Sequence, residues 1–92
     1  MHIKTQPFDI AAHLQSTENI RAFLQEVAET GDETDFIHAL NIAARAKGMS
    51  EVAISAGVTR ASLYKSLSED GNPRFDTISK IVKSLGCKLA VV

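Results

Sequence analysis

Residues 50–67, SEVAISAGVTRASLYKSL, predict two short helices joined by a sharp turn. Ser50 is placed to cap a helix that continues through Ala56, and Thr59 is placed to cap the second helix. Gly57 lies between them, and glycine readily adopts the left-handed conformation that ends a helix. The three residues that separate the two helices give the spacing of a helix-turn-helix motif.

The apolar residues of this stretch are spaced to pack the two helices against each other. Ala53 is small enough to let the second helix cross closely, and Val58 and Leu63 are placed as core anchors. The outward face of the second helix, residues 60–67, is then free to enter a major groove of DNA. A purely structural helical hairpin can show the same pattern, so the sequence leaves that alternative open.

The polar residues of the second helix are the candidate contacts to DNA. Its first two turns would face base edges, which selects Arg60, Ala61 and Lys65. Arg60 can donate two hydrogen bonds to guanine, whereas Ala61 can only touch a thymine methyl group. Lys65 can reach either a base or a phosphate. A solvated surface arginine is the alternative for Arg60.

A second set of residues is expected to fix the protein on the DNA backbone. Hydroxyl groups and the amides at a helix start are common phosphate ligands. The candidate phosphate contacts are Thr59, Ser62, Tyr64, Asn72, Arg74 and Thr77. Asn72 could instead only shape a turn and Arg74 could be solvated. Arg45 and Lys47 could approach the flanking backbone or form an ordinary charged rim.

Apolar residues at helical spacing predict further helices on both sides of the motif. The expected ranges are 10–14, 17–29, 32–48 and 75–85, with caps at Asp9, Ser16 and Asp32 and with Gly31, Gly48 and Gly86 at the ends. Phe75 is assigned to the core of the last helix. We therefore expect an all-α fold in a single domain, residues 1–92.

The last six residues, 87–92, are mostly apolar and favour a short β-strand. A lone strand needs a partner, so it is expected to pair with a second copy through Leu89, Val91 and Val92, or else to pack within its own chain. A homodimer is also expected because one recognition helix contacts only a few base pairs.

The charge of the chain is divided unequally along the sequence. Residues 1–44 carry two basic against seven acidic residues, a net charge of −5, and residues 45–92 carry eight against four, a net charge of +4. A basic half suits a polyanion and an acidic half suits a basic partner, although both could be ordinary solvated faces.

Several classes of protein are not expected from this composition. Cys87 is the single cysteine, and the three histidines share no ligand spacing, so neither a disulfide nor a metal site is predicted. No nucleophile elbow or phosphate-binding loop is present, so we expect no enzyme, cofactor or small-molecule substrate. The absence of a signal or membrane-spanning pattern predicts a cytoplasmic protein.

Segments along nearly the whole chain carry a resemblance to one bacterial group. They are Phe8-Asp9 with Leu14, AARAKGM at 43–49, SLYK at 62–65, GNPRFDT at 71–77 and Leu85-Gly86. On these segments the chain resembles the XRE/Cro helix-turn-helix group and, more closely, the HigA-like addiction-module antidote proteins, or antitoxins, of bacteria and prophages. The resemblance implies a λ-repressor-like fold, operator DNA of the protein's own operon as one partner, and a RelE-like RNase toxin as another.

Three functions are consistent with the sequence. In the first, residues 32–86 form the DNA-binding core and the acidic segment 1–31 holds the toxin. The apolar residues expected to contact the toxin are Phe8, Ile10, Leu14, Ile20, Phe23 and Leu24. The second is a stand-alone prophage-type regulator, and the third is an interaction module that only mimics a DNA-binding motif.

Overall fold

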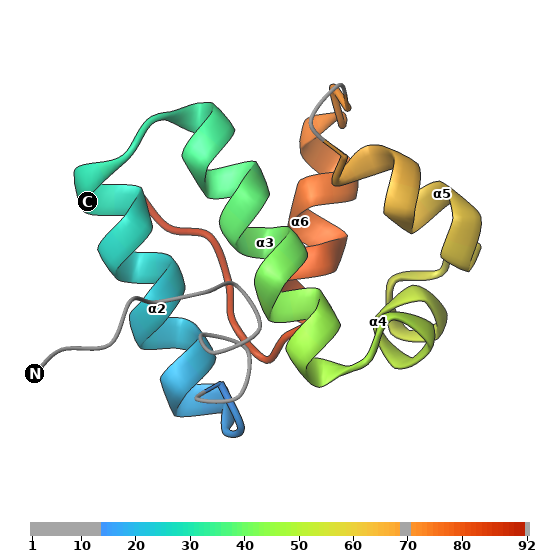
Figure 1. Cartoon of the computed structure of the whole chain (residues 1–92), viewed down its shortest axis with the longest axis horizontal. Helices are drawn as coiled ribbons and strands as arrows, with labels where there is room; N and C mark the ends of the chain where they lie inside the picture. Colours follow the sequence, from blue (N-terminus) through green and yellow to red (C-terminus); the bar gives the residue numbers. More distant parts are fainter. Residues whose placement is uncertain (1–13, 69–70, 92) are drawn as a thin grey trace, which may run out of the picture.

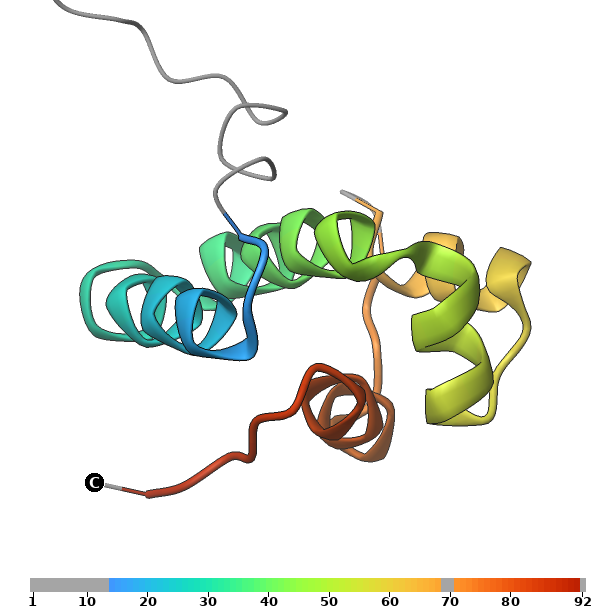
Figure 2. The same cartoon turned by 90° about the horizontal axis from the view of Figure 1, so that it is seen from below.

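The computed structural model describes residues 14–68 and 71–91, and its regular secondary structure in these ranges is entirely α-helical. The described helices are α2 (Thr17–Thr30), α3 (Glu33–Lys47), α4 (Met49–Ala56), α5 (Arg60–Ser66) and α6 (Phe75–Ser84). Figures 1 and 2 show α2 at one end of the molecule, α4 and α5 at the other, and α3 and α6 between them. The predicted all-α class is confirmed. The helix expected over residues 10–14, with its cap at Asp9, lies outside the described residues except for Leu14.

The two long helices begin at the caps that the sequence predicted. The Ser16 hydroxyl accepts a hydrogen bond from the Asn19 amide at 3.0 Å. Asp32 and Asp35 form a reciprocal capping box, in which each carboxylate accepts from the other residue's backbone N–H. These bonds satisfy amides that have no partner within the first turn of a helix.

The start of α4 differs from the prediction. The helix begins at Met49, and Gly48 rather than Ser50 stands at its N-cap position, with no side-chain capping bond. Gly48 has φ of 119°, which lets the chain pass directly from α3 into α4. Ser50 therefore lies within the first turn of the helix, where its side chain is free for another contact.

The core is formed by the apolar stripes of α2, α3, α4 and α6, joined by one face of α5. Its most completely buried large side chains are Val52, Leu40, Leu63, Ile81 and Leu85. α3 packs against α2, α4 and α6, and α4 packs against α5 and α6. Because Leu63 belongs to this core, the position of α5 is fixed by the body of the protein.

Two expectations at the end of the chain are wrong. Phe75 is 74% exposed rather than in the core. It is the first residue of α6 and lies one turn before Ile78, which is partly buried against the core. The described residues 87–91 form no strand. They leave α6 after Gly86 as an extended segment (Figures 1 and 2), and no described strand is available to pair with it.

No helix in the described ranges combines the length and the apolar character needed to cross a membrane.

Candidate nucleic-acid interface

The turn between α4 and α5 has the hydrogen bonds of a Schellman motif. Gly57 is left-handed, with φ of 73° and ψ of 30°. Its N–H donates to the Ile54 carbonyl, and the Val58 N–H donates to the Ala53 carbonyl at 3.0 Å. The predicted break at Gly57 is confirmed, and it sets the angle at which α5 leaves α4.

Helix α5 is held at its start by Thr59 and along one side by the core. The Thr59 hydroxyl accepts from the Ser62 N–H at 3.0 Å, which confirms the predicted cap. Leu63 and Leu67 are buried at 1% and 2% exposure. The opposite side of the helix is exposed, and it carries the predicted base-contacting residues Arg60, Ala61 and Lys65 together with Thr59 and Ser62.

Tyr64 lies between two arginines at the edge of this exposed face. The guanidinium carbon of Arg45 is 5.3 Å from the centre of the Tyr64 ring, and that of Arg60 is 5.5 Å from it. Both distances are within the range of cation–π attraction. We call Arg45, Arg60 and Tyr64 the arginine–tyrosine cluster, which joins the end of α3 to the start of α5.

Hydrogen bonds add to the positioning of both arginines. Arg60 donates from Nη1 to the Ser50 hydroxyl and from Nη2 to the Tyr64 hydroxyl, both at 3.4 Å. Arg45 donates from Nε to Asn41 Oδ1 at 3.1 Å. The Ser50 side chain, which does not cap α4, therefore helps to hold Arg60 on the surface.

The cluster changes the acidity of the tyrosine. The hydrogen bond from Arg60 is the main cause that lowers the pKa of Tyr64 below its ordinary value, and the charges of Arg60 and Arg45 lower it further. Partial desolvation of the phenol acts in the opposite direction. The hydrogen bond and the two charges together outweigh this desolvation, so the pKa of Tyr64 lies below its ordinary value.

Within the described residues, neither Arg45 nor Arg60 forms an ion pair with a carboxylate. The ion pair in this part of the chain joins Arg74 and Asp76. Arg45 and Arg60 are both exposed. Two guanidinium groups that share one ring repel each other, and an anion bound between or beside them relieves that repulsion. The arrangement is thus suited to a phosphate-bearing ligand.

The start of α6 is less suited to a phosphate than the sequence indicated. Arg74 Nε lies 3.4 Å from the carboxylate of Asp76, and that same oxygen accepts from the Thr77 N–H at 2.9 Å. A carboxylate therefore already occupies the amide that a phosphate would use. Asn72 is exposed in the segment before this helix.

The residues expected to contact a toxin are mostly not on the described surface. Leu14, Ile20 and Leu24 are buried in the core, and Phe23 is partly buried against it. Phe8 and Ile10 lie outside the described residues. Among the expected dimer contacts, Leu89 and Val91 are exposed and Val92 is not described.

Sequence reasoning missed the arginine–tyrosine cluster as a unit. The spacing of Arg60 and Tyr64, one helical turn apart, could have suggested their contact. Arg45 comes from another helix, and nothing in the local sequence brings it to the same ring.

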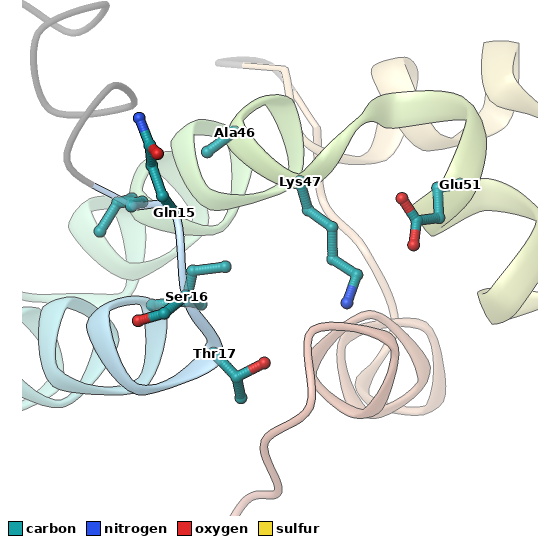
Figure 3. A pocket seen from close by; sticks show the side chains of 8 residues that line it. Gln15, Ser16, Thr17, Ala46, Lys47 and Glu51 are labelled. Carbon is teal, nitrogen blue, oxygen red and sulfur yellow. The ribbon is translucent and has the colours of Figure 1, made fainter.

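A small hollow of about 440 Å³ lies between the start of α2, the end of α3 and the start of α4 (Figure 3). Its charged lining residues in the described chain are Lys47 and Glu51, which have opposite signs. No cluster of three or more metal-ligating side chains occurs in the described ranges.

A family model described as "Probable addiction module antidote protein" matches residues 4–92 of the chain. The chain belongs to this family. An antidote of an addiction module counteracts a toxin, so membership supports an antitoxin role and implies a toxin partner in general.

One relative of the chain is a Haemophilus influenzae protein described as an uncharacterized protein. The two sequences are 42% identical over 84 residues, which cover 91% of this chain and 87% of the relative. No solved structure matches the chain.

Proposed function

We propose that the antidote is the antitoxin of a type II toxin–antitoxin module and that it represses its own operon by binding operator DNA through α5. The observation that carries the DNA-binding part is the arginine–tyrosine cluster, in which two arginines that pair with no carboxylate of the described residues are held beside one exposed helix face. We further propose that the α4–α5 pair belongs to a λ-repressor-like domain of the XRE/Cro group.

In this proposal α5 enters the major groove. Some of its exposed residues contact bases and others contact the DNA backbone. Arg60 donates two hydrogen bonds to a guanine, and Lys65 reaches a base edge or a phosphate. Ala61 contributes at most a methyl contact to thymine. The remaining contacts fix the register of the protein on the DNA backbone. They come from Thr59, Ser62, Tyr64 and Arg45.

The ring of Tyr64 gives the two arginines a defined position before DNA arrives. A side chain that is already ordered loses less conformational entropy when it binds. The hydrogen bonds of Arg60 to Ser50 and Tyr64 are long, at 3.4 Å, so little energy is lost when the guanidinium exchanges them for a guanine.

The second activity is neutralisation of a RelE-like RNase toxin encoded beside the antidote. Family membership favours this role over that of a stand-alone regulator. We also propose that the antidote binds its operator as a homodimer, since two recognition helices about 34 Å apart would match two half-sites of a palindrome.

The DNA-binding part is tested by titrating labelled DNA from upstream of the antidote gene, and unrelated DNA of equal length, at several salt concentrations. We expect tighter binding to the upstream DNA, with an affinity that falls steeply as salt rises. The double variant Arg60→Ala/Lys65→Ala should lose this preference. The proposal would be rejected if the unmodified protein bound both DNAs with equal affinity, or if its affinity did not change with salt concentration.

A further inference from the structure

An open groove of about 1390 Å³ lies between the start of α3, the end of α5 and the start of α6. Its lining in the described chain includes the apolar residues Phe75, Pro73 and Leu89 and the carboxylates of Asp32, Glu33 and Asp35, but no lysine or arginine. We call it the acidic groove. It is separate from the exposed face of α5 that we propose for DNA.

The apolar part of the groove includes an unusually exposed aromatic ring. Phe75 is 74% exposed and Leu89 is 40% exposed, although large apolar side chains of this kind are more often buried. An exposed aromatic side chain is a typical anchor of a protein–protein interface.

The charged part of the groove determines what kind of partner fits. No basic side chain of the described residues pairs with Asp32, Glu33 or Asp35. Asp32 and Asp35 each use one carboxylate oxygen in the capping box of α3, so their second oxygens remain available to another group. A surface whose described lining holds three carboxylates, one histidine and no lysine or arginine repels DNA phosphates and attracts lysine and arginine.

A second copy of the same chain is a poorer occupant than a basic protein. In a two-fold symmetric contact the same patch meets itself, so the carboxylates of the two copies would approach each other. A partner that carries lysine or arginine around an apolar side chain instead complements both parts of the groove.

We infer that the acidic groove is the docking surface for the toxin, with Phe75 as its apolar anchor and the start of α3 as its anionic rim. This inference rests on the proposed antitoxin role. It moves the expected toxin contacts away from Leu14, Ile20 and Leu24, which are buried in the core, to the exposed side chain of Phe75 and to the carboxylates at the start of α3.

The inference is tested with the purified protein encoded by the reading frame beside the antidote gene, titrated by calorimetry into the full-length antidote. Phe75→Ala should weaken binding about thirtyfold, as expected for an aromatic hot spot. Glu33→Gln should weaken it about threefold and reduce its salt dependence, as expected for a charge at the rim. Neither side chain is buried, so Phe75→Ala should unfold at nearly the same temperature as the unmodified protein. Glu33→Gln removes a favourable charge from the first turn of α3 and should unfold at most a few degrees lower.

Two matched controls lie outside the groove. Ile54 is 81% exposed on α4, and Glu18 lies in the first turn of α2 as Glu33 does in α3. We expect Ile54→Ala and Glu18→Gln to leave the affinity for the neighbouring protein unchanged.

Each contrary result has a different meaning. If Phe75→Ala binds the neighbouring protein as tightly as the unmodified antidote, the groove assignment is wrong while the antitoxin role stands. If the unmodified antidote does not bind that protein at all, the proposed toxin partnership fails and the inference fails with it. If Phe75→Ala converts a dimer to a monomer in sedimentation, the groove is a contact between copies and the inference is also overturned.

Discussion

Tyr64 connects two helices of the candidate DNA interface through its ring and its hydroxyl group. The ring lies within cation–π distance of Arg45 on α3 and Arg60 on α5, and the hydroxyl accepts a hydrogen bond from Arg60. The acidity of this one phenol should therefore report whether the arginine–tyrosine cluster is assembled in solution.

Replacing Arg60 by alanine should raise the pKa of Tyr64 toward the ordinary tyrosine value of about 10. The variant removes a hydrogen bond and a positive charge that both favour the phenolate. The chain has one tyrosine and no tryptophan, so ultraviolet absorbance of the phenolate follows this residue alone. Lys88→Ala serves as a control that removes an exposed charge elsewhere. Superimposable titration curves for Arg60→Ala and the unmodified protein would contradict the cluster.

The ring and the hydroxyl of Tyr64 should contribute unequally to DNA affinity. Tyr64→Phe keeps the cation–π contacts and loses the hydroxyl, so we expect affinity for the upstream DNA to fall about threefold. Tyr64→Ala loses both and should lower it about tenfold. Fluorescence anisotropy with labelled DNA measures the difference. An equal loss in the two variants would show that the ring does not position the arginines.

At the scale of secondary-structure elements, the stability of the α4–α5 pair depends on two local structural features. One is the hydroxyl cap of Thr59 and the other is the left-handed conformation of Gly57. Each can be removed by a single substitution that leaves the core unchanged.

Thr59→Ala should lower the free energy of unfolding by about 1 kcal/mol, because the Ser62 amide loses its acceptor. Thr59→Ser retains the hydroxyl and should restore most of that stability. Urea denaturation followed by circular dichroism gives both values. A serine variant as unstable as the alanine variant would show that the methyl group of Thr59, and not its hydroxyl, matters here.

Gly57→Ala should also cost about 1 kcal/mol of unfolding free energy. A β-carbon at this position meets no atom within 4 Å, so the cost comes from the left-handed backbone alone. The same denaturation measurement applies. A loss of several kcal/mol would instead indicate that the added methyl group disturbs the packing of α4 and α5.

The elements that sequence analysis predicted well are those determined by local chemistry. The caps at Ser16, Asp32 and Thr59 and the break at Gly57 depend on residues within one or two turns. The exposure of Phe75 was not predictable in this way, because helical spacing alone does not show where a helix leaves the core. The expected strand at 87–92 failed for a similar reason, since strand formation requires a partner that the local sequence does not identify.

The same distinction applies to the candidate sites. Arg60, Ala61 and Lys65 could be placed on the exposed face of α5 from spacing alone, and the structure places them there. The contact between Arg45 and Tyr64 joins different helices, and the acidic groove joins the starts of α3 and α6. Tertiary packing brings these residues together, so neither arrangement could be derived from the order of residues.

Over the whole molecule, acidic and basic residues that are separated along the sequence also lie on two separate surfaces. The arginine–tyrosine cluster joins the end of α3 to α5, whereas the acidic groove begins at the opposite end of α3. In the proposed function, one of these surfaces binds the DNA polyanion and the other binds a basic protein.

The central claim is that Arg60 contacts a base of operator DNA. It is tested most directly by the specificity ratio of Arg60→Ala, which is the dissociation constant for unrelated DNA divided by that for the upstream DNA. The measurement compares dissociation constants for the upstream DNA and for unrelated DNA at one fixed salt concentration. Loss of a bidentate contact to guanine should weaken binding to the upstream DNA by about tenfold or more, with a much smaller effect on unrelated DNA. An unchanged ratio between the two dissociation constants would contradict the claim.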